Sequence, residues 1–161
     1  MRHIQWLLFF MFAACTTLSP QSSNTPQWTA SEVQFNTIDT NDPSSFIGLT
    51  LAELLSLFGV PMAVYPERGP EDWQDDVIFM YNNGLNFYVY KDRVWQISLQ
   101  SAYGVKIGDS RSSSATMLRW PVENYDNCTL YSLPSRGWPL VLRLDFIDSL
   151  VSVIRIYRSD F

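Results

Sequence analysis

Hydrophobic and polar residues divide the chain into parts with different patterns. An apolar run from Ile4 to Ala14, interrupted only by Gln5, follows the positively charged Arg2. This run of 11 residues has the length of a signal-peptide core. A membrane-spanning helix takes roughly 20 residues. The stretch 16–31 is rich in Ser, Thr, Asn, Gln and Pro, so it cannot bury enough surface to fold alone. The periodic patterns of a folded part begin near residue 46.

Two segments of the folded part share the same spacing, 60 residues apart. Gly48 and Gly108 each begin a segment that reaches a proline, Pro61 or Pro121, 13 positions later. In the first segment Leu51, Leu54, Leu55 and Phe58 mark one face of a helix, and the second segment carries Met117 and Leu118. The spacing predicts one short helix in each segment and an internal duplication of the folded part.

Capping residues mark the expected ends of these helices. Thr50 and Ser110 are suited to accept hydrogen bonds from free amides of a first helical turn. Glu53 lies three residues after Thr50, which is the spacing of a capping box. Gly59 is expected to end the first helix. The second helix is expected to be weaker, because the serines at 112–114 are poor helix formers.

Alternating apolar residues after each helix predict strands that are joined by tight turns. The predicted strands are 77–81, 85–90, 93–99, 140–146 and 150–157. Lys91-Asp92 and Ile147-Asp148 are the predicted turns of the last hairpin in each copy. The predicted fold class is therefore α+β, with two tandem helix-plus-antiparallel-meander units packed as one domain. Unit 1 would cover 46–103 and unit 2 would cover 104–161.

The end of the apolar run, Phe12-Ala13-Ala14-Cys15, resembles the bacterial lipobox, although Phe12 replaces the preferred leucine. The resemblance implies cleavage before Cys15 and lipid on that cysteine. Residues 1–14 would then be a lipoprotein signal peptide, and 15–45 the lipidated cysteine with a flexible tether. Two acyl chains make a stable anchor, whereas one chain binds a membrane only marginally. Ordinary signal cleavage, with Cys15 incidental, is the alternative.

A second resemblance covers roughly residues 46–161. The helix motif and the strands ending in LNFYVYKDRVWQI resemble the SmpA/OmlA lipoproteins, which include the small lipoprotein of the outer-membrane β-barrel assembly machine. Two such units in tandem resemble the β-lactamase inhibitor protein fold. The matching residues are Gly48, Thr50, Glu53, Leu54, Phe58, Gly59, Pro61, Asp92, Val94 and Ile97. The resemblance implies a binding protein rather than an enzyme.

Charge and composition exclude several function classes. The chain has a net charge of −5, and loss of Arg2 with the signal peptide leaves ten basic residues against 16 acidic ones. Nucleic-acid binding needs clustered Lys and Arg, so it is not expected. His3 is the only histidine and lies in the signal peptide, which removes histidine-based nucleophile pairs and the usual zinc sites. No catalytic residue, metal or cofactor is therefore expected.

Five carboxylates gather between Pro66 and Val77: Glu67, Glu71, Asp72, Asp75 and Asp76. Their main interpretation is a solvated acidic loop. Two carboxylates could instead serve glycan hydrolysis, and several could hold Ca²⁺. With Cys15 lipidated, Cys128 has no partner for a disulfide within the chain.

The alternation of side chains between the two faces of each hairpin predicts a partner site. When the sidedness of the second copy is transferred to the first, Tyr88, Trp95 and Ile97 face the core. The open face then carries Phe87, Val89, Val94 and Gln96, and an exposed apolar patch on a sheet marks an interaction surface. The inverted assignment, which exposes Tyr88 and Tyr90, is the alternative.

The sequence therefore indicates a non-catalytic, lipid-anchored protein of the bacterial cell envelope that binds another envelope protein. Its expected role is in outer-membrane assembly or maintenance. Because Thr16, and not Asp, follows Cys15, the outer membrane facing the periplasm is the favoured location. Two alternatives remain: an inhibitor of an envelope hydrolase, and a carboxylate-dependent cell-wall glycan hydrolase. The sequence leaves the oligomeric state open.

Overall fold

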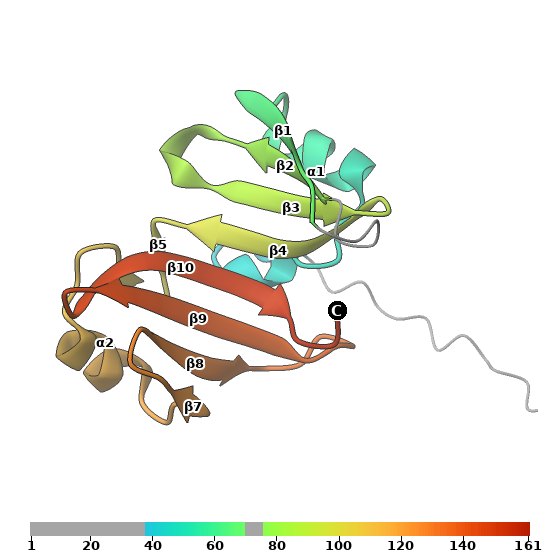
Figure 1. Cartoon of the computed structure of the whole chain (residues 1–161). Helices are drawn as coiled ribbons and strands as arrows, with labels where there is room; N and C mark the ends of the chain where they lie inside the picture. The colour runs from blue at the N-terminus through green and yellow to red at the C-terminus, as the bar shows by residue number, and fades with distance from the viewer. Residues whose placement is uncertain (1–37, 70–75) are drawn as a thin grey trace, which may run out of the picture. The chain divides into compact units, whose positions relative to one another are not determined.

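The computed structural model describes residues 38–69 and 76–161, drawn in colour in Figure 1. Every described residue belongs to one compact unit of the chain. The predicted signal peptide and Cys15 lie outside the described residues. No helix within the described ranges has the length and hydrophobicity needed to span a membrane.

One antiparallel sheet of eight strands dominates the described part, with the order β1-β2-β3-β4-β10-β9-β8-β7 (Figure 1). Its strands are β1 (Ala63–Glu67), β2 (Asp76–Met80), β3 (Asn86–Tyr90), β4 (Arg93–Leu99), β7 (Glu123–Asn124), β8 (Cys128–Leu133), β9 (Leu140–Ile147) and β10 (Leu150–Arg158). A separate hairpin consists of β5 (Ser101–Ala102) and β6 (Val105–Lys106). The helical elements are η1 (Pro43–Phe46), α1 (Leu51–Phe58), η3 (Asn82–Gly84) and α2 (Arg111–Leu118).

The predicted α+β fold class is wrong. Two helix-plus-meander units do not pack against each other, because β4 and β10 pair and join the two meanders into one continuous sheet. This pairing satisfies backbone groups that two separate meanders would each leave at an edge. The two α-helices have only eight residues each, so the fold is more β-rich than the prediction.

Local signals placed both helices correctly. The Thr50 side chain accepts from the Glu53 backbone N–H, and the Glu53 carboxylate accepts from the Thr50 backbone N–H, which completes the capping box. Ser110 caps α2 by accepting from the Ser113 N–H. These bonds satisfy amides that a helix start leaves without an intrahelical partner.

The two halves of the sheet share the same local geometry. Gly48 N donates to Val94 O at 2.8 Å, and Gly108 N donates to Val151 O at 2.8 Å. The helix N-cap residues also form equivalent isolated bridges, Thr50 with Arg93 and Ser110 with Leu150. Each helix start is therefore fixed to the beginning of the last strand in its own half.

The central strand pair relates the halves by a local two-fold axis. Val94 on β4 and Val151 on β10 are equivalent residues of the two halves. Ile97 and Ile154, three residues later in each strand, are therefore equivalent as well, and so are Leu99 and Ile156. The central cross-strand pairs are Ile97–Ile156, Ser98–Arg155 and Leu99–Ile154. Because Ile97 pairs with the equivalent of Leu99, and Leu99 with the equivalent of Ile97, the axis passes between Ser98 and Arg155.

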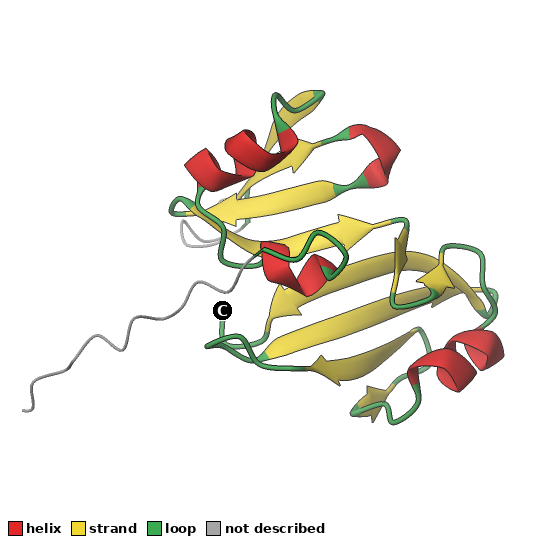
Figure 2. Ribbon diagram, turned by 180° about the vertical axis from the view of Figure 1, so that it is seen from behind, coloured by secondary structure: helices red, strands yellow, loops and turns green. Residues whose placement is uncertain are grey.

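The hydrophobic core lies on one face of this sheet. Elements α1 and η1 lie behind the strands in Figure 1 and in front of them in Figure 2. The aromatic rings of Phe46, Phe58, Tyr81 and Phe87 connect these elements to the sheet. The ring centre of Phe58 lies 4.9 Å from that of Phe87 and 5.0 Å from that of Phe46, and the ring centres of Tyr81 and Phe87 are 5.6 Å apart. Ser44 and Ser45 are also buried, so the packed part of the chain includes residues before 46.

Candidate functional site

Most of the predicted partner site is buried. Phe87 and Val94 are 0% exposed and Val89 is 6% exposed, so all three belong to the core. Their assignment to the open face is wrong. Gln96 does lie on the open face, where it lines a pocket.

The position of one turn explains the error. The second hairpin turns at Asp148 and Ser149, which both have positive φ, as Lys91 and Asp92 do in the first hairpin. The prediction placed this turn one residue earlier, at Ile147-Asp148. A shift of one residue sends each side chain of a strand to the opposite face. With the turns aligned, Val94 is the equivalent of Val151, and both are buried.

A β-bulge in β4 adds to the reversal. Val89 pairs with Val94 and Tyr88 pairs with Gln96, so Trp95 is the extra residue. Trp95 and Gln96 both reach the open face, and alternation resumes at Ile97, which is fully buried as predicted. Strand β10 has a bulge between Val151 and Val153, at the equivalent place. The predicted core positions of Tyr88 and Trp95 are thus wrong, and the alternative that exposes Tyr88 was closer.

A pocket of about 400 Å³ lies on the open face. Strands β1, β2, β3, β4 and β10 supply six of its lining residues, and the seventh follows β10. The lining residues are Glu67, Asp76, Tyr88, Trp95, Gln96, Arg155 and Phe161. Sequence reasoning found Gln96 on this face, and placed Glu67 and Asp76 in an acidic cluster. It missed the aromatic residues, because only the turn alignment and the bulge show which face they take.

The aromatic side chains of this face form a continuous row. Tyr90 meets Phe161 edge to face at 5.3 Å, and Phe161 stacks on Trp95 at 5.0 Å with an angle of 9° between the rings. The ring centres of Trp95 and Tyr88 are 6.4 Å apart. Trp95 Nε1 donates to Asp76 Oδ1 at 3.0 Å. This bond fixes the orientation of the indole ring against β2.

Charged groups occupy opposite ends of the pocket. Glu67 and Asp76 are cross-strand partners in the β1–β2 pair. At the β10 end, Arg155 Nη1 lies 2.9 Å from Asp145 Oδ2, while Arg143 Nε lies 2.7 Å from Asp145 Oδ1. One carboxylate therefore serves two guanidinium groups. The β1–β2 end is negative, and the β9–β10 end keeps a net positive charge.

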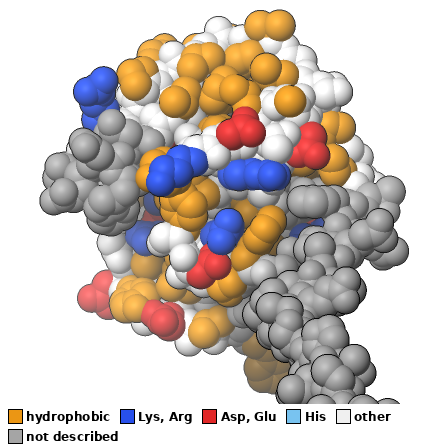
Figure 3. Space-filling view, turned by 90° about the vertical axis from the view of Figure 1, so that its right-hand side faces the viewer, with side chains coloured by type: hydrophobic (Ala, Val, Ile, Leu, Met, Phe, Trp, Pro, Cys, Tyr) orange, Lys and Arg blue, Asp and Glu red, His pale blue; other side chains and the backbone are white. Residues whose placement is uncertain are grey.

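Exposed apolar residues recur at equivalent positions of the two halves. Four residues in and after α1 are exposed, and so are the four residues that lie 60 positions later. The pairs are Leu57 and Met117, Val60 and Trp120, Met62 and Val122, and Tyr65 and Tyr125. Val60 is 90% exposed and Trp120 is 87% exposed. Figure 3 shows hydrophobic side chains gathered at the top, the level of β1 and α1 in Figure 1. Both edges of the sheet thus carry similar apolar surface.

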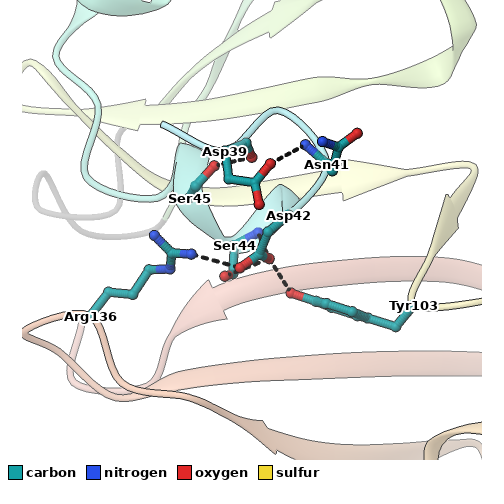
Figure 4. A network of polar contacts seen from close by, with 7 residues as sticks. All are labelled: Asp39, Asn41, Asp42, Ser44, Ser45, Tyr103 and Arg136. Carbon is teal, nitrogen blue, oxygen red and sulfur yellow. Dashed lines mark hydrogen bonds and ion pairs between the residues drawn. The ribbon is translucent and has the colours of Figure 1, made fainter. Parts of the chain in front are cut away.

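A second polar cluster surrounds Asp42 at the start of η1 (Figure 4). Asp42 Oδ1 accepts from Ser44 Oγ and from Tyr103 OH, each at 2.8 Å. Asp42 Oδ2 accepts from Arg136 Nη2 at 2.7 Å. Because Tyr103 follows β5 and Arg136 precedes β9, this carboxylate connects η1 to two distant loops. The cluster is a structural clasp.

Stability at acid pH should depend on this clasp. Burial alone would raise the pKa of Asp42, but hydrogen bonds from Ser44, Tyr103 and Arg136 together lower it below 3.8. A lowered pKa contributes stability that is present above the unfolded-state value of 3.8 and is lost as the pH falls through the folded-state value. Asp42→Asn should therefore cost about 1–2 kcal/mol at pH 7 and less below pH 3.

Urea unfolding of the wild type and Asp42→Asn between pH 7 and pH 2 measures this effect. Asp109→Asn is a matched control, because Asp109 accepts only a local backbone N–H, from Lys106. A difference between wild type and Asp42→Asn that stays constant down to pH 2 would contradict the assignment. Tyr103 gives a second check at high pH. Its pKa is raised to about 12 by burial and by Asp42, so its contribution should persist at pH 10 and be lost as the pH rises through 12.

The remaining candidate chemistry is limited. Within residues 38–69 and 76–161, no group of three or more His, Cys, Asp and Glu side chains is placed to hold a metal ion. Cys128 is a free, buried thiol on β8. The open-face pocket is therefore the strongest candidate site, and its aromatic and charged lining is suited to binding.

Comparisons with known proteins bear on the fold alone. No protein-family model matches the sequence, and the search of curated proteins found no match. The structure is similar to that of an extracellular protein containing a SCP domain from Bacillus anthracis str. Ames, with a TM-score of 0.51 and 12% sequence identity. The similarity covers 78% of this chain and 48% of that chain, so this chain spans about half the length of its neighbour.

Proposed function

We propose that this chain is a non-catalytic lipoprotein outside the cytoplasm that binds another envelope protein on the open face of its sheet. The observation that carries the proposal is the pocket of about 400 Å³ with an aromatic row, on the face that α1 and η1 leave uncovered. Binding sites are usually concave and combine aromatic or apolar side chains with polar groups that fix the orientation of what they bind. The partner site is thus moved from Phe87, Val89 and Val94 to Tyr88, Trp95, Gln96 and Arg155.

The lipid anchor of the proposal depends on the sequence of residues 1–15. A location outside the cytoplasm is compatible with the structural neighbour, which is an extracellular protein. The outer-membrane location, the SmpA/OmlA resemblance and the role in outer-membrane assembly remain predictions from the sequence. These predictions name the membrane and the partner. The pocket, in contrast, indicates how a partner would be bound.

Labelling of growing cells with palmitate tests the anchor. The wild-type protein is expected to take up label, because two or more acyl chains are needed for stable attachment. Cys15→Ser should take up no label and should keep residues 1–14. Cys128→Ser is the matched control and should label like the wild type. Equal labelling of the Cys15→Ser and wild-type proteins would overturn the proposed anchor.

Photocrosslinking in intact cells tests the partner face. A benzoyl-phenylalanine at Gln96, on the open face, should give one predominant adduct with a protein that mass spectrometry then identifies. The same residue at Leu57, exposed on α1, is the control for random collisions. The variant Trp95→Ala should lower the yield of the Gln96 adduct at least fivefold. Equal adducts from both positions, or a Gln96 adduct unaffected by Trp95→Ala, would contradict the proposed face.

A further inference from the structure

We propose that the open-face pocket holds a positively charged side chain, a lysine or an arginine, which the partner protein presents. This inference rests on the proposed function, because it assumes that the partner docks on this face. It adds the chemistry of the group that enters the pocket. Three independent features of the lining support it: the aromatic row, the distribution of charge, and the size of the pocket.

The aromatic row already carries cations at one end. Lys91 Nζ lies 5.0 Å from the centre of the Tyr90 ring, and the Arg158 guanidinium lies 5.7 Å from the centre of the Phe161 ring. The ring quadrupole attracts a cation placed over its face, and the attraction is stronger when the contact is desolvated. In the described part of the chain, no cation occupies the corresponding place over Trp95. Trp95, at the pocket end of the row, can therefore bind a cation from another molecule.

The charges of the lining favour a cation at that end. Glu67 and Asp76 line the pocket beside Trp95, and Asp76 Oδ1 accepts the hydrogen bond from the indole N–H. These two carboxylates are cross-strand partners on β1 and β2, and together they give this end of the pocket a negative field.

The opposite end of the pocket repels a cation. Asp145 is shared by Arg143 and Arg155, so these three side chains carry a net charge of +1. A bound cation is therefore directed toward Glu67 on β1 and Asp76 on β2, beside Trp95. The same positive charge favours an acceptor or an acidic group of the partner near Arg155, which fixes the orientation of the bound segment.

The pocket size fits one long side chain. A volume of about 400 Å³ lies at the lower end of the range of about 300–1,000 Å³ that is usual for ligand sites. The pocket thus suits a single extended lysine or arginine with part of its backbone. The aromatic rings would cover the apolar stem of that side chain, while the carboxylates meet its charged head.

A titration with short peptides tests the inference on the full chain in detergent micelles. The probes are acetyl-Gly-Arg-Gly-amide and the same peptide with citrulline, which is neutral but has nearly the shape of arginine. The NMR signal of Trp95 Nε1–H, assigned with Trp95→Phe, reports binding. The arginine peptide is expected to shift this signal saturably and to bind about fivefold to tenfold more tightly than the citrulline peptide.

Two variants show whether the pocket carboxylates are responsible. Glu67→Gln should weaken binding of the arginine peptide about fivefold. Glu123→Gln is the matched control, because Glu123 is an exposed carboxylate on β7, at the other edge of the sheet. It should bind like the wild type. Equal weakening by both variants would show that only the net charge of the protein matters, and would overturn the inference.

Other outcomes would also overturn it. Equal affinity for the arginine and citrulline peptides would remove the role of charge. Saturable binding of chitotriose, with none of the arginine peptide, would point to a neutral glycan and would favour the hydrolase alternative. No saturable shift with any probe would mean that the pocket binds no such group. If Gln96 still crosslinks a partner in cells, only this inference fails; if arginine binds and no partner is found, the proposed function fails.

Discussion

Phe87→Ala is expected to lower the free energy of unfolding by about 3–5 kcal/mol, which is the usual cost of removing a fully buried phenylalanine. Phe87 is 0% exposed and contacts three aromatic rings of the core, those of Phe46, Phe58 and Tyr81. Its removal leaves a cavity between β3 and α1 that rigid ring neighbours cannot fill. Urea unfolding of the full chain, followed by far-UV circular dichroism, measures the loss.

Tyr88→Ala is the matched control, because Tyr88 is the next residue of β3 and lies on the opposite face. It should lose only the pair with Trp95, about 0.5–1.5 kcal/mol. Equal losses for the two variants would contradict the assignment of the sheet faces. Because Phe87 and Val94 are core residues, a loss of partner binding in Phe87→Asp or Val94→Asp would report unfolding. Binding has to be tested with substitutions at Tyr88, Trp95 or Gln96.

Gly48→Ala is expected to have the second largest effect, about 2–5 kcal/mol. Gly48 has a φ of +92°, a conformation that costs an L-residue about 1–2 kcal/mol. A Cβ atom at this position would also overlap the ring of Trp138. That ring is partly buried against the core and lies 4.7 Å from the Arg158 guanidinium, so it cannot move without losing contacts. Overpacking of this kind adds about 1–3 kcal/mol.

Gly108→Ala separates the two contributions. Gly108 is the equivalent glycine of the other half and has a φ of +90°, but no atom lies within 4 Å of the position that an added Cβ would take. Its substitution should cost only the backbone strain, about 1–2 kcal/mol. The same urea unfolding measures both variants. If Gly108→Ala cost as much as Gly48→Ala, the overlap with Trp138 would have no effect and the structural reason would be wrong.

The elements that the sequence predicted are those with strong local signals. Helix α1 has a capping box at its start and Gly59 at its end, and the structure shows both. Strand β4 lies at 93–99 as predicted, because Lys91-Asp92 forms a tight turn before it. These features depend on bonds between residues that are close in the sequence, so that propensity and spacing decide them.

Five strands escaped prediction: β5, β6 and β7 have only two residues each, and the two longer ones, β1 and β8, have weak local signals. Strand β1 (Ala63–Glu67) contains Pro66 and has mostly exposed side chains, as an edge strand tolerates. Strand β8 (Cys128–Leu133) contains polar residues at positions 129 and 132, which obscure the alternation of apolar side chains. Their partners, β2 and β9, supply the hydrogen bonds that make these segments strands. Because the prediction from the sequence omitted these strands, it underestimated the β content of the fold.

Local sequence was enough to specify the two short helices, the Lys91-Asp92 turn and the 60-residue spacing of the duplicated segments. The pairing of β4 with β10 into one sheet, and the choice of side chains that face the core, became visible only in the folded chain. The pairing joins residues that lie more than 50 positions apart, so no local pattern specifies it. The faces depend on one bulge at Trp95 and on one turn at Asp148-Ser149. Because side chains alternate with a period of two, a difference of one residue exchanges the core face for the open face.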